Sequence, residues 1–205
     1  MSEEKDRVTS RDIKAQERRQ QILAVAKKLF AEDGYHATSM RTLNKALGVA
    51  EALTYHYFPG GKLDILQTIL REGRAAGIAR TEALAPLFRD DLSLREALLL
   101  AARVGTNIFT GDKELLQIVV RERNWLRREE WLATLAGGDS PTQFLYDFFA
   151  RRMAQGAIRE MDLRFAFMQF FASMTIHSLF VEDDDTDEKH YVERLVDFTV
   201  RLWSR

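Results

Sequence analysis

Residues 38–62 read TSMRTLNKALGVAEALTYHYFPGGK, and this stretch decides the fold of the first third of the chain. A helix is predicted over about 40–47, because a threonine and a serine before it offer hydroxyl caps. Gly48 interrupts this helix, and a second short helix is expected over about 50–57 before a proline and two glycines end it. Two short helices joined by a tight turn form a helix-turn-helix, whose second helix enters the major groove of DNA.

Helices are also predicted on both sides of this stretch. Before it, an apolar stripe at helical spacing ends near Gly34. After it, a long helix starts near Lys62 and runs past Arg80. We therefore expect an N-terminal helix-turn-helix DNA-binding domain over 1–62, ordered from about residue 11. The residues of the stripe are Ile22, Leu23, Val25, Ala26, Leu29 and Phe30.

The remaining residues, 63–205, carry no alternating strand-like runs, and the whole chain has only three prolines. The chain is therefore predicted to be all-α, with a three-helix N-terminal bundle and a C-terminal domain of about six helices, to which the ligand-sensing and dimerisation roles argued below are assigned. Beyond the long helix after residue 62, helices are expected over about 92–109, 113–136 (one long or two broken helices), 141–155, 162–181 and 187–203.

Composition limits the class of protein. The 205 residues include no cysteine, which suits a reducing cytoplasm and excludes a disulfide framework. The N-terminus has no apolar run, and the longest uncharged stretch is shorter than the roughly 20 apolar residues of a membrane span.

Net positive charge is concentrated in the first third of the chain. Residues 1–62 hold 11 Lys and Arg against 8 Asp and Glu, and residues 63–205 hold 19 Lys and Arg against 23 Asp and Glu. A basic first third suits a nucleic-acid partner, and ordinary scatter explains it equally well. We expect a cytoplasmic protein with no membrane partner and no cofactor.

The residues from Arg18 to Leu66 resemble the N-terminal domain of the TetR family of bacterial transcriptional regulators. The run YHYF shortly before Lys62 is the most specific feature. The other matching pieces are Ile22-Leu23, Ala26, Leu29-Phe30, Gly34-Tyr35, Ala37-Thr38-Ser39-Met40 and Gly48-Val49. The resemblance closely covers about a quarter of the chain. It implies a homodimeric repressor that a small molecule releases from a palindromic operator.

Four positions depart from the family pattern. Ala50 stands where a serine often caps the recognition helix, and a second glycine places Lys62 one residue late. Asn44 and Thr54 stand where an alanine and a Leu or Ile normally pack together. One hypothesis is that they form a hydrogen bond inside the helix-turn-helix, because a buried amide without a partner costs about 1–3 kcal/mol. The alternative is that both tilt toward solvent.

The exposed residues of the two short helices are candidates for DNA contact. The second helix is nearly free of positive charge, so its affinity is expected to come from phosphate contacts around it. Glu51 either accepts a hydrogen bond from a cytosine amino group or is simply solvated at a helix N-terminus. The predicted DNA-binding residues are Thr38, Ser39, Arg41, Lys45, Ala50, Glu51, Ala52, Tyr55, His56 and Lys62.

The last two helices are predicted to form a homodimer interface. The helix over 162–181 has no charged side chain after Arg164 and is apolar on every face. A thin helical domain covers one side of such a helix, and a second subunit is the natural cover for the other. The helix over 187–203 is similarly apolar, so two helices from each chain would form a four-helix interface with two-fold symmetry.

A mostly apolar cavity for a small lipophilic or aromatic effector is expected among the helices between Lys62 and residue 155. Polar residues placed among apolar ones would orient the ligand, and phenylalanines would form the walls. The alternatives are a surface or ion-paired position for the arginines and a core position for the aromatic residues and His177. The predicted ligand-binding residues are Arg103, Asn107, Phe109, Trp125, Phe144, Phe148 and His177. A ligand there would shift the helix after Lys62 and change the spacing of the two recognition helices.

Two other classes of function compete with a ligand-responsive repressor. The four histidines lie far apart, and no metal, phosphate-loop or nucleophile motif is present, so no catalytic or metal-ligating residue is predicted. A DNA-binding architectural protein that senses no ligand is the second alternative. A close-packed C-terminal domain would favour that alternative, and a cavity would favour the sensor.

Overall fold

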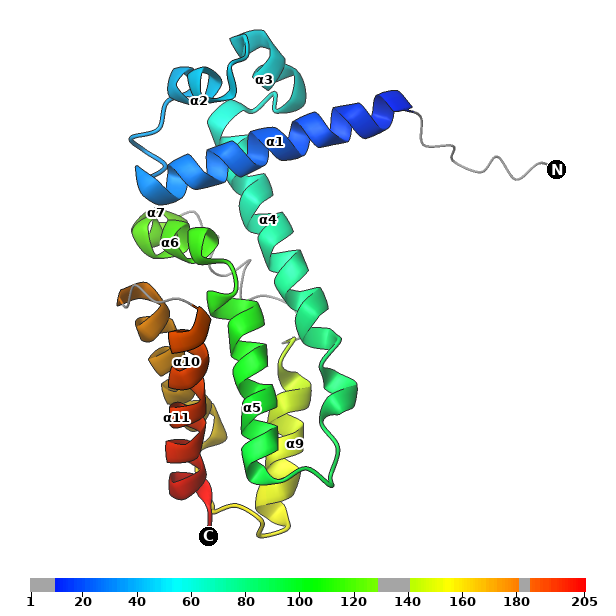
Figure 1. Cartoon of the computed structure of the whole chain (residues 1–205), viewed down its shortest axis with the longest axis vertical. Coiled ribbons are helices and arrows are strands. Elements are labelled where there is room, and N and C mark those ends of the chain that lie inside the picture. The colour runs from blue at the N-terminus through cyan, green and yellow to red at the C-terminus, as the bar shows by residue number, and fades with distance from the viewer. Residues whose placement is uncertain (1–9, 129–140, 181–184) are drawn as a thin grey trace, which may run out of the picture.

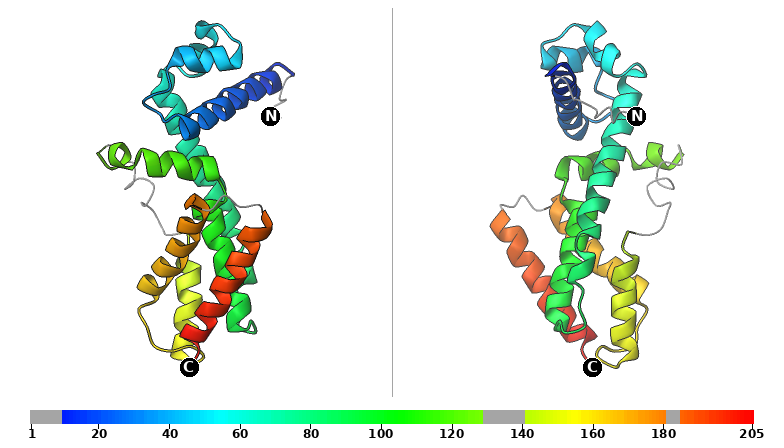
Figure 2. Two further views of the ribbon diagram at one scale, coloured as in Figure 1. Left: turned by 60° about the vertical axis from the view of Figure 1, so that its left-hand side comes forward. Right: turned by 90° about the vertical axis from the view of Figure 1, so that its right-hand side faces the viewer.

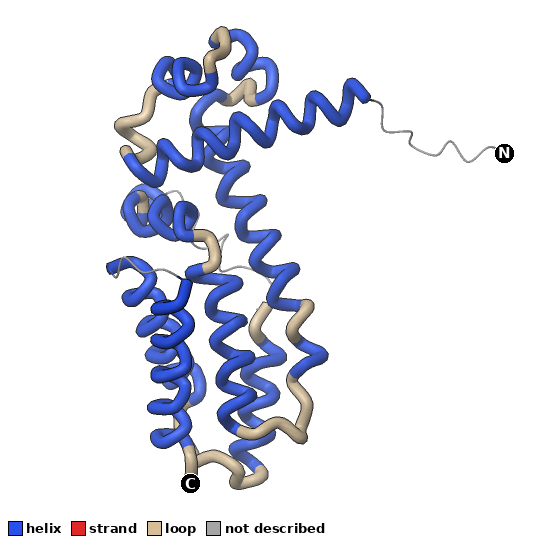
Figure 3. The backbone as a smooth tube through the Cα atoms, in the orientation of Figure 1, coloured by secondary structure: helices blue, strands red, loops and turns tan. Residues whose placement is uncertain are grey.

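Every regular element in residues 10–128, 141–180 and 185–205, the parts that the computed structural model describes, is a helix (Figure 3). This confirms the all-α prediction. Among these residues, none of the helices is both long enough and apolar enough to cross a membrane. The elements are α1 (Ser10–Glu32), α2 (Met40–Leu47), α3 (Glu51–Tyr57), α4 (Gly61–Glu82), the 3-10 helix η1 (Ala85–Leu87), α5 (Leu94–Gly105), the π-helix η2 (Thr106–Thr110), α6 (Lys113–Arg121), α7 (Arg123–Arg128), α9 (Gln143–Ala154), α10 (Leu163–Phe180) and α11 (Asp185–Trp203).

The helices fall into two groups that α4 connects (Figure 1). α1, α2 and α3 gather at one end of the molecule, and α5, α9, α10 and α11 form a bundle at the other. α6 and α7 lie between the two groups, as the additional views in Figure 2 also show. This intermediate position allows α6 to contact both α1 and α4.

Two clusters of buried apolar side chains hold these groups together. The C-terminal core gathers side chains of α5, α9, α10 and α11, with Phe167 and Trp203 edge to face at 5.1 Å. The N-terminal core gathers side chains of α1, α2 and α4. It also includes Ile118 of α6 and Leu126 of α7, both with no exposed surface. The N-terminal helices therefore share their core with residues that lie more than 60 positions beyond the end of α3.

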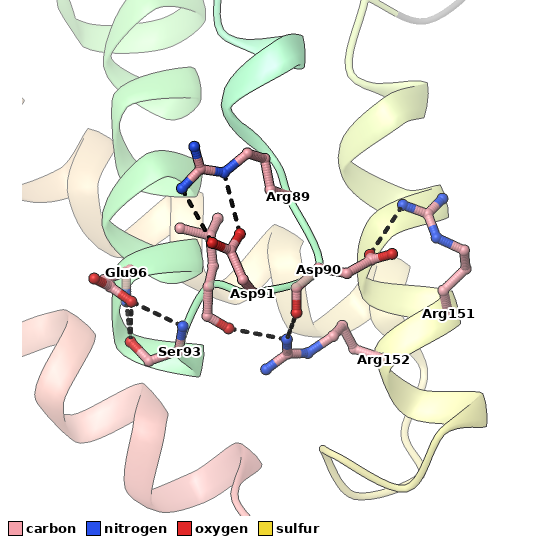
Figure 4. A network of polar contacts seen from close by, with 8 residues as sticks. Arg89, Asp90, Asp91, Ser93, Glu96, Arg151 and Arg152 are labelled. Atoms are coloured by element: carbon pink, nitrogen blue, oxygen red, sulfur yellow. Dashed lines mark hydrogen bonds and ion pairs between the residues drawn. The ribbon is translucent and has the colours of Figure 1, made fainter.

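A polar network fixes the start of α5 to α9 (Figure 4). The helix expected from residue 92 begins at Leu94, because Ser93 and Glu96 form a capping box there. The guanidinium of Arg152 in α9 donates to the backbone oxygens of Asp90 and Leu92 at 3.0 and 2.9 Å. These bonds satisfy carbonyls of the loop that connects η1 to α5.

After α5 the chain continues as a π-helix, which has more residues per turn than an α-helix, and then the helix ends. η2 is a π-helix that ends with a 2.6 Å bond from Gly111 N–H to the carbonyl of Thr106. η2 packs closely on α4, since a Cβ atom built at Gly77 would lie only 2.8 Å from the backbone oxygen of Asn107. Asp112 then caps α6 by accepting from Leu115 N–H at 3.0 Å. The predicted break between the two helices is confirmed, and the π winding was not anticipated.

Within residues 113–128, the described part of the segment expected over 113–136, the chain forms two helices rather than one, since α6 ends at Arg121 and α7 starts at Arg123. The later part of that segment, with Trp131, and the turn expected over 137–140 lie outside the described residues.

Candidate DNA-binding surface and effector cavity

The helix-turn-helix forms as its local sequence predicts. Ser39 caps α2, and its hydroxyl oxygen accepts from Thr42 N–H at 3.0 Å. Gly48 ends α2 with a φ of 66°, a left-handed conformation that glycine adopts without strain. Ala50 precedes α3 and makes no side-chain cap, as its methyl group dictates. The start of α2 thus depends on Ser39, and the turn between the two helices depends on Gly48.

A polar pair lies inside the helix-turn-helix. Asn44 and Thr54 are 6% and 0% exposed, and the Thr54 hydroxyl donates to the Asn44 side-chain oxygen. The hypothesis that these two residues pair is therefore confirmed, and the alternative that they tilt toward solvent is wrong. The Asn44 amide nitrogen is buried without a partner among the described residues. Leu43, next to Asn44 in the sequence, and Phe58 are almost fully buried in the N-terminal core.

The predicted DNA-reading face of α3 is exposed. Ala50, Glu51, Ala52, Tyr55 and His56 all lie at the surface, so their side chains are accessible to a groove of DNA. On α2, Arg41 and Lys45 are exposed as well. The surface combines two cations beside a helix that carries small and polar groups. This is the arrangement in which phosphate contacts position a protein and base contacts specify the sequence.

Two other predicted DNA contacts point into the fold. The Thr38 side chain is buried, and its hydroxyl donates to the Gly34 carbonyl at 2.9 Å. The Lys62 ammonium donates to the backbone oxygens of Tyr35 and Thr38 at 2.7 and 2.8 Å. Lys62 therefore fixes the loop between α1 and α2, a structural role beside the phosphate contact, which stays a prediction.

The surroundings of Lys62 shift the pKa of its ammonium. Burial lowers the pKa of its ammonium, and the carboxylate of Glu122 acts in the opposite direction. The ammonium also lies 4.3 Å from the ring centroid of Tyr35. Burial, and secondarily Glu122, raises the pKa of the Tyr35 phenol. These three side chains form the polar centre of the α1–α2 loop.

A cavity of about 260 Å³ lies between α4, η2 and α6. Most of its wall is apolar, and α6 contributes Leu115, Leu116 and Val119. Polar groups come from Asn107 and Asp112, and Arg74 and Arg80 of α4 also line it. The volume is close to the lower end of the range for small-molecule sites, roughly 300–1,000 Å³. The cavity can therefore hold a small, mostly apolar group.

The structure brings together only part of the predicted ligand set. Asn107 and Phe109, both in η2, line the cavity. Of the predicted bounding helices, α4, the end of the α5–η2 helix and α6 surround it, and Pro141 before α9 completes the lining.

The other five predicted ligand residues lie elsewhere in the described structure, and none of them lines this cavity. Arg103 is exposed on α5. Phe144 and Phe148 pack against Phe88 at centroid distances of 5.4 and 5.3 Å. Trp125 stacks on Tyr35 at 5.5 Å, because the break at the end of α6 turns α7 toward the α1–α2 loop, and His177 stacks on Tyr191 at 3.8 Å.

The residues that sequence reasoning missed are the aliphatic wall residues of α6. Their spacing is the spacing of an ordinary core face, so nothing in it distinguishes a cavity from a filled core. One signal was available on α4, where Gly73 and Gly77 lie one turn apart. A Cβ at Gly73 would meet the Leu115 side chain at 2.5 Å, so these glycines mark the face that α6 and η2 approach closely.

Comparison with known proteins connects these features to one family. The pattern of the bacterial regulatory proteins of the tetR family matches residues 22–69. The fatty acid metabolism regulator protein of Bacillus subtilis is 27% identical over 158 residues, 75% of this chain and 78% of its own length. The HTH-type transcriptional repressor Rv1474c of Mycobacterium tuberculosis is 36% identical over 78 residues, which cover 37% of this chain and 41% of that protein. The second match is therefore restricted to less than half of either chain.

Solved structures extend the likeness to the C-terminal helices. The TetR family transcriptional regulator PfmR of Thermus thermophilus aligns with a TM-score of 0.67 at 27% identity, over 88% of this chain and 97% of its own. AibR, solved in complex with isovaleryl coenzyme A and operator DNA, aligns with a TM-score of 0.67 at 22% identity, over 88% and 97%. The ketosteroid transcriptional regulator KstR2 of Mycobacterium tuberculosis gives 0.72 at 16% identity, over 92% and 95%. The last two likenesses concern the fold alone. The relatives named are regulators of transcription, not enzymes.

Proposed function

Because this chain belongs to the tetR family of bacterial regulatory proteins and is a DNA-binding transcriptional regulator, we propose that it is a repressor that leaves its operator when a small lipophilic effector binds. The observation that carries this proposal is the cavity against α4, the helix that begins directly after the helix-turn-helix. A filled core would have favoured an architectural protein that senses no ligand. The division into a DNA-binding domain up to about residue 62 and a sensing domain beyond it is part of this proposal.

The DNA-reading role is assigned to the exposed residues of α2 and α3. Arg41 and Lys45 contact phosphates, and Tyr55 joins them from α3. Glu51 is the candidate to accept from a cytosine amino group in the major groove. Its exposure at the start of α3 supports this assignment and equally permits simple solvation. A change in operator preference on Glu51→Ala would favour base reading.

The proposed operator-binding form is a homodimer through the helices over 162–181 and 187–203. On α10, Phe165, Met168 and Ile176 are 53%, 58% and 57% exposed. Phe198 and Leu202 of α11 are 57% and 47% exposed. Large apolar side chains seldom gather on the surface of a soluble monomer, and two adjacent helices that both expose them fit a self-complementary interface. A second copy of this chain is therefore the proposed cover.

The proposed effector carries an acyl group. The apolar wall and the small volume of the cavity suit a short or branched hydrocarbon chain. The Bacillus relative is named as a regulator of fatty acid metabolism, and AibR was solved with isovaleryl coenzyme A. These names support an acyl thioester or a free fatty acid as the first compounds to test.

The test starts with selection of an operator from random duplex DNA, followed by fluorescence anisotropy. We expect a palindromic site, release by one member of a series of acyl coenzyme A esters, and no release by free coenzyme A. Lys45→Ala should lower the salt slope of binding by about one unit, whereas Lys28→Ala, an exposed lysine of α1, should leave it unchanged. Binding that shows no sequence preference would refute the operator model.

A further inference from the structure

The cavity shares its wall with the core of the DNA-binding helices. Leu70 of α4 and Leu115 and Val119 of α6 line the cavity and also belong to or pack on the N-terminal core. Two lining residues of η2 also pack on the C-terminal core, Ile108 as a half-buried neighbour and Phe109 through its ring, 5.6 Å from that of Phe171. A group bound in the cavity therefore touches the same side chains that stabilise α1 and α2.

α6 is fixed to α1 and its loop at both ends. At its start, Asp112 lines the cavity and lies 2.6 Å from the ammonium of Lys27 in α1. At its end, the guanidinium of Arg121 donates to the Glu32 carbonyl at 2.7 Å. A displacement of α6 by an occupant of the cavity is thus transmitted directly to the C-terminal half of α1.

Glu122, at the break between α6 and α7, makes the most demanding of these contacts. Its side chain is 8% exposed, and its carboxylate accepts from Tyr35 N–H at 3.0 Å. The imidazole of His36 lies 3.5 Å from the same carboxylate. A buried carboxylate is stable only while its hydrogen bonds are made, so this contact tolerates little movement. The Lys62 ammonium donates to the backbone oxygens of Tyr35 and Thr38, and so fixes the residues that lead into α2.

We propose that Glu122 is the positioning residue that couples the cavity to the helix-turn-helix, and that the cavity takes one compact apolar group between α4 and α6. This inference rests on the proposed function and adds the structural path by which an effector would change DNA binding. An occupant pushes the end of α6, Glu122 pulls the α1–α2 loop, and the pose of α2 and α3 changes. The occupant alters DNA binding because it binds the two poses with different affinity.

The test replaces the unknown effector with a permanent occupant. Val119→Phe puts a ring where the cavity is, and Val120→Phe is the matched control, since Val120 is the next residue of α6 and is not among the lining residues. We expect Val119→Phe to weaken operator binding about tenfold, within the usual range of coupling between sites. Val120→Phe should change it less than twofold.

The role of Glu122 is tested by introducing Val119→Phe and Val120→Phe into proteins that also carry a substitution at Glu122, and measuring operator binding again. With Glu122→Ala, Val119→Phe should no longer weaken operator binding, because the link is cut. With Glu122→Gln, whose amide oxygen can still accept from Tyr35 N–H, most of the weakening should remain. A merely structural Glu122 would lower the melting temperature but leave the tenfold effect intact, and that result would overturn the proposal.

The remaining outcomes separate the two proposals. If Val119→Phe unfolds the protein, Leu116→Phe fills the cavity from a residue outside the N-terminal core and is judged by the same criterion. Equal operator affinity for the filled variants and the control would overturn the coupling while leaving the repressor model intact. Absence of operator binding by the unchanged protein would instead refute the repressor model.

Discussion

The faces that α3 and α10 expose differ in chemistry. α3 exposes Glu51 and Ala52 and buries the hydroxyl of Thr54 against an amide. α10 exposes Met168 and Ile176 and buries phenylalanines in the C-terminal core. Helices in soluble proteins usually bury apolar side chains and expose polar ones. α3 departs from this pattern by burying a polar group, and α10 departs from it by exposing apolar groups.

The difference indicates which partner each helix meets. DNA presents charged phosphates and polar base edges, so a face of small and polar side chains can approach it without burying unpaired apolar surface. A second protein subunit offers apolar surface of its own, so the α10 face gains free energy when it is covered. Four predictions challenge this reading, beginning with the largest effect.

The first prediction tests whether the DNA-reading end is independent of the rest. A fragment of residues 10–82 should show no cooperative thermal unfolding by circular dichroism, because Ile118 and Leu126 are missing from the N-terminal core. The full chain serves as the reference. A fragment that unfolds cooperatively would show that α1–α4 close their core without α6 and α7.

The second prediction concerns the apolar face. Met168→Glu should raise the dimer dissociation constant at least about a hundredfold, because a charge at a buried interface costs several kcal/mol. Gln117→Glu is the control, since Gln117 is exposed on α6, outside the proposed interface, and receives the same charge. Analytical ultracentrifugation measures both. A monomeric unchanged protein at micromolar concentration would contradict the assignment of this face to a second copy.

The third prediction concerns the buried polar pair. Thr54→Val should lower the free energy of unfolding by about 1–3 kcal/mol, because it leaves the Asn44 oxygen buried without a donor. The double variant Asn44→Ala, Thr54→Leu should recover most of that loss, since it removes both polar groups and fills the space between α2 and α3. Urea denaturation of the three proteins measures this. Full stability of Thr54→Val would show that the pair contributes nothing.

The smallest effect is expected at alkaline pH. The raised pKa of Tyr35 means that the folded protein holds this proton more tightly, so stability is lost as the pH rises above 10.0. The lowered pKa of Lys62 has the opposite sign, and stability is gained as the pH rises toward 10.5. Tyr35→Phe should therefore make the alkaline decline in unfolding free energy shallower, and Tyr55→Phe should not. Equal slopes for both variants would count against this account.

The parts of the molecule that sequence reasoning predicted correctly depend on short-range rules. The cap at Ser39, the left-handed glycine at position 48 and the two helices around it involve residues a few positions apart. The Asn44–Thr54 pair was accessible because two departures from a family pattern coincided at positions that normally pack together. The caps and helices needed only the local sequence, and the pair needed the family pattern as well.

The parts that were missed depend on contacts between distant residues. Tyr35 and Glu122 are separated by 87 positions, and no local feature indicates that a glutamate at the end of one helix receives a backbone N–H from a distant loop. Trp125 was expected in a ligand site as one of a few polar groups, placed among apolar residues, that would orient the ligand; the structure stacks it on Tyr35. These contacts form because α6 lies between the two groups of helices, where it packs against α1.

The π-helix η2 has a consequence for chain length. Its closing bond joins Gly111 to the fifth residue before it, so this turn contains one residue more than a regular helical turn. Deleting a residue from a regular helix rotates everything after it by about 100° and misplaces a whole face. A deletion within residues 106–110 would instead convert the wide turn into a regular one and leave the flanking faces in register. Related chains can therefore differ in length by one residue at this point and keep the same architecture.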